Sequence, residues 1–195
     1  DQAPKQIFDA VNEAGIEIEY LINNAGFGGH GMFHERKLED ELAMIQLNVV
    51  TLTELCHRFL PQMVARNSGR ILNVSSTASL PPGGPLQTVY FATKHYVTSF
   101  SYGIAGELDG TAVTVTALLP GATETEFAAT SGMDKTELFK KTASAQSVAQ
   151  DGYDAMVAGK LNAISGLTFA QSLMMKSIPF TPKRVLLKQI RKMQE

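Results

Sequence analysis

Short apolar segments alternate along this chain with long segments in which apolar residues recur at the helical period. The short segments are rich in β-branched residues and are followed by turn-forming residues, as is typical of strands. They predict strands over residues 18–22, 71–74 and 113–118, with a further strand near 161–164. Strands that are apolar throughout belong to sheets covered by helices on both faces. The pattern therefore predicts a parallel sheet in one α/β domain spanning residues 1–195.

The long segments predict the helices that cover this sheet. Apolar spacing predicts an amphipathic helix over 4–14 and longer helices over 38–65 and 88–108. One or two further helices are expected before about residue 159. We interpret residues 165–195 as a C-terminal helical extension that ends in a basic helix.

Composition and charge exclude several classes of function. The 195 residues carry a formal net charge of −2 at pH 7, so there is no electrostatic case for binding nucleic acid. The single cysteine, Cys56, can form no internal disulfide, which suits a reducing cytoplasm. No apolar run approaches the ~18 residues of a membrane span, so no integral membrane segment is expected.

Polar and turn-forming residues follow each predicted strand. Asn23-Asn24-Ala25-Gly26 follows the first strand, Ser75-Ser76 follows the second, and Pro120-Gly121 stops the third. In an open parallel sheet, ligands bind outside the carboxyl ends of the strands. The sequence therefore predicts a ligand site that these three segments share.

The segment Gly26-Phe27-Gly28-Gly29-His30-Gly31 matches the G-x-G-x-x-G pattern of dinucleotide-binding turns. In such a turn the next helix begins at once, and the following strand leads to an acidic residue that binds a ribose hydroxyl. Here the next predicted helix begins only near Leu38, and the following strand ends in Ser75-Ser76. We interpret the segment as a loop that does not bind phosphate.

Tyr90 and Lys94 lie four positions apart in a predicted helix (94 − 90 = 4), so their side chains project from the same face. An unperturbed tyrosine has a pKa of ~10. A neighbouring ammonium group favours the phenolate, so we expect Lys94 to lower the pKa of Tyr90 toward neutrality. A tyrosine with such a pKa can act as a general acid or base.

Several motifs then follow one another in a recognisable order: Asn23-Asn24-Ala25-Gly26, Asn48, Asn73-Val74-Ser75-Ser76, Tyr90-x-x-x-Lys94 and Pro120-Gly121-x-x-x-Thr125. Over about residues 5–130 the chain resembles the short-chain dehydrogenase/reductase family. The resemblance implies a Rossmann-like, doubly wound parallel sheet and a nicotinamide cofactor, NAD or NADP. It also implies hydride transfer to or from a small-molecule carbonyl or alcohol, and a homo-oligomer that assembles through the long helices.

The resemblance also implies a role for each matching residue. Tyr90 would be the general acid/base, and Lys94 would lower its pKa and bind the nicotinamide ribose. Ser76 would donate a hydrogen bond to the substrate oxygen. Asn48 would hold a water molecule that links Lys94 to solvent. The expected cofactor-binding residues are Asn24, Ala25, Gly26, Tyr90, Lys94, Pro120, Gly121, Thr123 and Thr125.

The chain departs from the family pattern in two ways. Ser76 and Tyr90 are fourteen positions apart (90 − 76 = 14), one more than expected, and we place the extra residue in Pro82-Gly83-Gly84-Pro85. The glycine-rich phosphate loop of the family should precede the strand at 18–22, and the chain, which opens on Asp1, does not supply it. We therefore expect the C-terminal portion of a longer fold. The strand at 18–22 should form an exposed edge, and this chain alone should bind a dinucleotide weakly.

Other features leave alternatives open. His30, His34 and Glu35 could suggest a metal site, but no third ligand is spaced convincingly, so we expect loop histidines and no metal. Leu173, Met174 and Met175 belong to the core, or to a flexible lid or partner surface. The basic face of the last helix is solvated or weakly associated with a membrane surface, and it consists of Lys183, Arg184, Lys188, Arg191 and Lys192. The rival to an oxidoreductase is a non-catalytic fragment or binding protein of the same fold that lacks cofactor binding.

Overall fold

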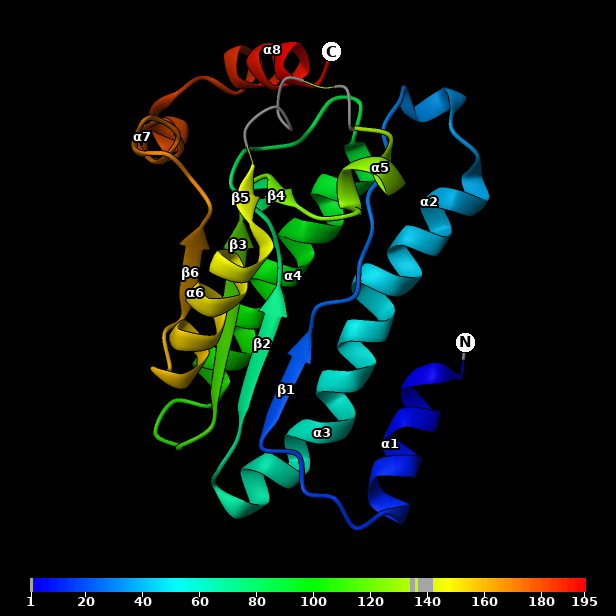
Figure 1. Ribbon diagram of the computed structural model, residues 1–195, viewed down its shortest axis with the longest axis vertical. Coiled ribbons are helices and arrows are strands. Elements are labelled where there is room, and N and C mark those ends of the chain that lie inside the picture. The colour runs from blue at the N-terminus through cyan, green and yellow to red at the C-terminus, as the bar shows by residue number, and fades with distance from the viewer. Residues whose placement is uncertain (1, 134–135, 137–141) are drawn as a thin grey trace.

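The centre of the computed structural model is a parallel sheet of four strands (Figure 1). The structure describes residues 2–133, 136 and 142–195. The strands lie side by side in the order β1 (Tyr20–Asn23), β2 (Arg70–Val74), β3 (Thr114–Pro120) and β6 (Asn162–Ser165). Every pairing between them is parallel, so the predicted α/β architecture is confirmed.

Helices cover both faces of this sheet. α3 (Leu52–Arg66) and α4 (Thr88–Glu107) pack on one face and α6 (Ala145–Val157) packs on the other (Figure 1). In β2, Ile71 belongs to the cluster with α3 and α4, whereas its neighbour Leu72 belongs to the cluster with α6. Successive side chains of a strand point to opposite faces, so a strand buried on both sides must be apolar at consecutive positions.

Two strand boundaries differ from the prediction by two residues. Ile18 packs against the core cluster that α3 and α4 share, but the ladder begins only at Tyr20. β3 continues beyond the predicted end at residue 118 because Leu119 and Pro120 pair with β6. The partner strand, which is distant in sequence, therefore sets the length of β3.

The helix predicted over 38–65 is one helical run in three parts. α2 (Leu38–Ile45) leads into a π-helical turn, η2 (Gln46–Thr51), and α3 follows directly. The π turn contains the buried Asn48, whose side chain bonds to the main chain of a loop outside the helix. Single π turns inside α-helices are frequent at functional sites.

β1 is an edge strand, and β2 is its one neighbour in the sheet among the residues that the structure describes. Its side chains Tyr20 and Ile22 are 41% and 49% exposed. The exposed edge expected for this strand is therefore confirmed. An apolar edge presents unpaired backbone groups to other chains.

The chain ends in a helical segment that lies beyond the carboxyl ends of β2 and β3 (Figure 1). This segment consists of α7 (Phe169–Ser177), η5 (Ile178–Phe180) and α8 (Lys183–Gln194). The remaining elements are α1 (Ala3–Glu13), η1 (Phe33–Glu35), η3 (Thr77–Ser79), β4 (Thr123–Glu124), α5 (Phe127–Ser131) and β5 (Ala143–Ser144). Over the described ranges, none of the helices has the length and apolar character needed to cross a bilayer.

Candidate active site

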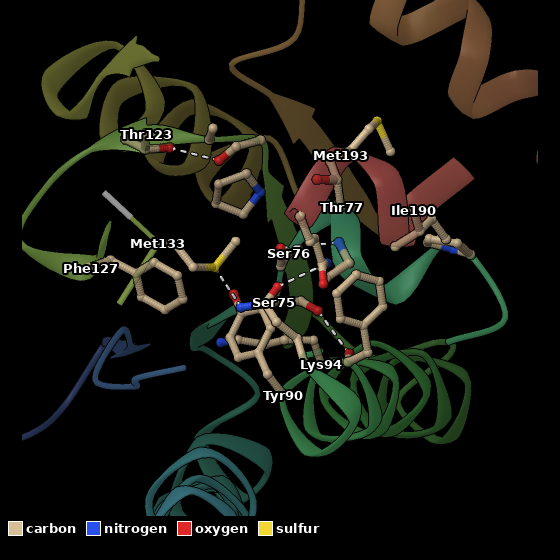
Figure 2. A pocket seen from close by; sticks show the side chains of 18 of the residues that line it. Ser75, Ser76, Thr77, Tyr90, Lys94, Thr123, Phe127, Met133, Ile190 and Met193 are labelled. Carbon is tan, nitrogen blue, oxygen red and sulfur yellow. Dashed lines mark hydrogen bonds between the residues drawn. The ribbon is translucent and has the colours of Figure 1, made fainter. Parts of the chain in front are cut away.

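A cavity of about 1350 Å³ lies at the carboxyl ends of the strands, where the sequence predicts a ligand site. Its wall is built by the ends of β2 and β3, by one turn of α4 and by side chains of α8 (Figure 2). Side chains of α7 also line it. Of the predicted cofactor-binding residues, all but Ala25 line this cavity in the described part of the chain. The fold therefore brings together segments that lie far apart in the sequence.

Tyr90 and Ser76 meet in the wall of this cavity. Tyr90 is 8% exposed and its hydroxyl is hydrogen-bonded to the side chain of Ser76. Ser76 lies just after β2 at the start of η3, where its Oγ accepts a hydrogen bond from the backbone N–H of Ala78 at 3.1 Å. The fourteen positions between the two residues (90 − 76 = 14) do not separate their side chains.

The pKa of Tyr90 moves in the opposite direction to the prediction. Burial of the phenol disfavours the phenolate and raises the pKa of Tyr90 to about 12, although the hydrogen bond from Ser76 acts in the lowering direction. Lys94 Nζ lies 5.8 Å from the centroid of the Tyr90 ring, over its face. Desolvation therefore outweighs any attraction to the ammonium group, and Tyr90 keeps its proton at neutral pH.

Lys94 is a buried cation beside Tyr90. It is 6% exposed, and its Nζ donates a hydrogen bond of 2.9 Å to the carbonyl of Val74 at the end of β2. Burial lowers the pKa of Lys94 to about 8, because the ammonium loses its hydration. The hydrogen bonds of the described residues use one of its three N–H groups, and Lys94 lines the cavity.

The two adjacent serines have different environments. Ser75 is 3% exposed, donates to the carbonyl of Lys94 at 2.9 Å, and shares a hydrogen bond of 2.7 Å with Thr98 Oγ1. These bonds attach the end of β2 to α4. Ser76, by contrast, contacts Tyr90, so the geometry favours Ser76 as the residue that faces a reacting group.

Asn48 holds the loop that carries Phe27. Its Nδ2 donates to the carbonyl of Phe27 at 2.9 Å and to Thr93 Oγ1 at 3.2 Å, while its Oδ1 accepts from the N–H of Phe27 at 3.1 Å. Both amide hydrogens are therefore used, and Oδ1 keeps one lone pair. In this structure Asn48 lies behind the Phe27 loop and holds that loop beside the cavity.

Gly26 lies against Asn48 and Lys94. A Cβ built on Gly26 would lie 2.9 Å from Asn48 Oδ1 and 3.6 Å from Lys94 Nζ, so a side chain there would fill the space beside the ammonium group. The interpretation of the glycine segment as a loop is consistent with this packing, because its glycines permit close contacts with side chains. Gly28, for example, would place a Cβ 2.7 Å from the ring of Phe127.

The sequence did not identify the wall that the C-terminal segment contributes. Leu186 and Ile190 of α8 are buried in one cluster with Tyr90 and Phe91, and Met193 packs against it. The end of α8 is fixed by a hydrogen bond of 2.9 Å between His30 Nε2 and the carbonyl of Gln194. The amphipathic pattern of α8 was visible in the sequence, but nothing in it indicated where the apolar face would pack.

Two further predictions concern side chains near this wall. Met174 and Met175 line the cavity, so of the two interpretations the lid is favoured over the core. His34 is exposed and pairs only with the adjacent Glu35 at 3.7 Å among the described residues. In the same part of the chain, no group of three or more His, Cys, Asp or Glu side chains could hold a metal ion.

Comparison with known proteins identifies the family of this fold. Residues 1–136 match the family model described as short chain dehydrogenase. An uncharacterized oxidoreductase of Bacillus subtilis is 41% identical over 118 residues, which cover 60% of this chain and 44% of that protein. The NADP-dependent 3-hydroxy acid dehydrogenase of Escherichia coli K12 is 43% identical over 107 residues, 53% of this chain and 42% of that protein. The chain spans about half the length of the curated relatives it matches.

Solved structures extend the likeness to nearly the whole chain. A short-chain dehydrogenase from Sphingobium yanoikuyae in complex with NADPH has a TM-score of 0.76 at 27% identity, covering 98% of this chain and 73% of that one. A 7β-hydroxysteroid dehydrogenase has a TM-score of 0.79 at 20% identity, covering 97% of this chain and 71% of that one. The second likeness shows the fold alone.

Proposed function

Because the chain belongs to the short-chain dehydrogenase family, we propose that its cavity transfers a hydride between a nicotinamide cofactor, NAD or NADP, and a carbonyl or alcohol. The observation that carries this proposal is the convergence of three hydrogen-bond donors, Ser76, Tyr90 and Lys94, on one cavity. The names of relatives that use NADP support the class of cofactor.

The residues present fit the nicotinamide end of such a cofactor. Lys94 has N–H groups that can donate to ribose hydroxyls, and the missing Cβ of Gly26 leaves space beside its ammonium group. The turn after β3 supplies Pro120, Gly121 and Thr123 to the opposite wall. When bound, the cofactor supplies or accepts the hydride, and the protein supplies position and protons.

In the direction of reduction, Tyr90 acts as the general acid. Its raised pKa keeps the phenol protonated at neutral pH, so it can give its proton to the substrate oxygen as the carbonyl carbon gains a hydride. Ser76 donates a hydrogen bond to the same oxygen, where negative charge develops. Asn48 acts indirectly, by holding the Phe27 loop beside the cavity.

Replacement of Tyr90 by phenylalanine tests this assignment. With saturating NADPH and a panel of aldehydes and ketones, kcat/KM should fall by about 10²–10⁴ in Tyr90→Phe, because the proton donor is lost. Tyr96→Phe is the matched control, since Tyr96 lies on the same helix, is 39% exposed and bonds to Thr53. Tyr96→Phe should retain wild-type activity and wild-type NADPH binding, which is measured by fluorescence.

Two outcomes would refute the proposal. Activity that survives in Tyr90→Phe would show that another group delivers the proton. A wild-type chain that reduces none of these compounds and binds neither NADH nor NADPH would favour the alternative, a non-catalytic fragment or binding protein of the same fold.

The proposal includes self-association through the long helices. Leu42 and Ile45 of α2, Val50 of η2 and Tyr96 of α4 are apolar or aromatic side chains that are 36% to 54% exposed. Burial of this surface against a second copy would remove it from water. Light scattering coupled to size exclusion measures the mass in solution and tests this part.

A further inference from the structure

The part of the cavity wall around Tyr90 includes a large apolar cluster. Phe91, Leu186 and Ile190 form one buried cluster with Tyr90. Phe27, Phe127, Ile178 and Met193 pack against this cluster and also line the cavity. A substrate whose carbonyl oxygen reached Tyr90 and Ser76 would place the rest of its structure against hydrocarbon and aromatic rings.

Methionine is concentrated in this wall. Of the eight methionines in the chain, four line the cavity, namely Met133, Met174, Met175 and Met193. A methionine side chain is unbranched, flexible and polarizable, so it adapts to apolar ligands of different shapes. Such a wall suits substrates that share a lipophilic body and vary in outline.

Charged groups are scarce in the same wall. Among the described residues that line the cavity, the side chains with a formal charge are Lys94, Glu126 and Lys192. Lys94 is bound to the Val74 carbonyl, while Glu126 and Lys192 are exposed to solvent. A carboxylate placed beside Tyr90 would lose its hydration and find no free buried cation in this part of the chain.

A large part of the apolar wall comes from residues that the family match does not reach. The family model covers residues 1–136, whereas Met174, Ile178, Leu186, Ile190 and Met193 all lie later in the chain. The family match alone therefore does not define the substrate of this cavity, and the lining must be considered by itself.

We propose that the substrate of this site is a neutral, lipophilic aldehyde, ketone or alcohol with an extended hydrocarbon body, and that hydroxy acids are excluded. That this ligand is a substrate follows from the proposed function, whereas its lipophilic character follows from the residues that line the cavity. Apolar ligands should bind more tightly with each methylene that the wall covers, by roughly threefold to fourfold.

Binding is tested on the chain without cofactor by displacement of the neutral fluorescent dye N-phenyl-1-naphthylamine. The competitors are methyl ketones of six, eight and ten carbons, each paired with the keto acid of the same length in which a terminal carboxylate replaces the far methyl group. Affinity for the ketones should rise about tenfold for each two added carbons. Each keto acid should bind at least about tenfold more weakly than its ketone.

Two lysine substitutions separate the cavity from the outer surface. Met193→Lys places a cation in the wall and should narrow the gap between ketone and keto acid by about tenfold. Phe169→Lys makes a similar change at a side chain that is 87% exposed and is not among the lining residues, so the gap should stay unchanged. Circular dichroism confirms that both variants are folded. If Met193→Lys does not fold, the comparison of ketones with keto acids on the wild-type chain still tests the proposal.

The inference is overturned if keto acids bind as tightly as ketones, if affinity does not rise with length, or if Met193→Lys and Phe169→Lys behave alike. Length-dependent binding without NADPH-dependent turnover would overturn the proposed reaction and leave the lipophilic site established.

Discussion

The buried ammonium group of Lys94 should destabilise the fold at neutral pH, so replacing it with methionine should stabilise the protein. Burial lowers the pKa of Lys94 from 10.5 to about 8, a difference of about 2.5 (10.5 − 8). Each pKa unit corresponds to about 1.4 kcal/mol, so the buried charge costs about 3 kcal/mol. Methionine matches the length of the side chain but loses the hydrogen bond to Val74, worth about 1 kcal/mol. The net gain is about 2 kcal/mol.

The pH dependence of this gain follows from proton linkage. Below about pH 8, Lys94 is charged in both the folded and the unfolded chain, and the full cost is present. Between about pH 8 and 10.5 the unfolded chain holds a proton that the folded chain has released, so wild-type stability rises with pH in this window. Lys94→Met lacks the group, so its advantage should be greatest at pH 7 and should shrink toward pH 10.

Urea unfolding followed by circular dichroism at pH 7 and pH 10 measures both free energies of unfolding. Lys160→Met is the control, because Lys160 is exposed and its removal should change stability by less than about 0.5 kcal/mol. If Lys94→Met is less stable than the wild type at pH 7, or if the difference does not change with pH, the buried charge is not a cost and the reasoning fails.

Three other predictions concern the loop, the pH profile and the sheet edge. Asn48→Ala should lower the free energy of unfolding in urea by about 2–4 kcal/mol, because two backbone groups of Phe27 lose their hydrogen-bond partners. Gln62→Ala removes an exposed amide and should lower it by less than about 0.5 kcal/mol. Equal effects of the two substitutions would contradict the role of Asn48. For carbonyl reduction, kcat/KM should fall above about pH 8 as Lys94 loses its proton. Lys94→Arg should move this fall in kcat/KM to higher pH. A profile that stays flat to pH 10 would contradict a role for the Lys94 proton. Ile22→Lys should reduce concentration-dependent light scattering without lowering the thermal midpoint, because Ile22 is 49% exposed on an edge strand. Unchanged scattering would show that this edge does not drive association between chains.

Sequence patterns predicted the elements of the fold better than their boundaries. The apolar segments predict each main strand because burial on both faces demands apolar residues at consecutive positions. They do not predict that β3 runs on to Pro120, since its pairing with Ile164 and Ser165 of β6 sets that end. The π turn at Asn48 was also hidden, because the apolar spacing over residues 38–65 is that of an unbroken helix.

The candidate site, like the fold, was predicted only in part from the sequence. The motif order placed Ser76, Tyr90 and Lys94 correctly in one cavity, because it reports the ends of adjacent strands and one helix face. Its prediction for the pKa of Tyr90 was wrong in direction, since desolvation depends on every element packed around the phenol. The wall from α8 was missed because no spacing in the sequence relates residues 186–193 to residue 90.

The pKa values of Tyr90 and Lys94 together favour one direction of chemistry. With values of about 12 and about 8, the ammonium releases its proton before the phenol does as pH rises. At neutral pH, Tyr90 and Lys94 are therefore both protonated, and with the hydroxyl of Ser76 they present three donors to one cavity. Donors of this kind require acceptors, and a carbonyl oxygen and ribose hydroxyls are such acceptors. Alcohol oxidation would need the phenolate, which burial opposes in the chain as folded, and this agrees with the proposed role of Tyr90 as a proton donor in carbonyl reduction.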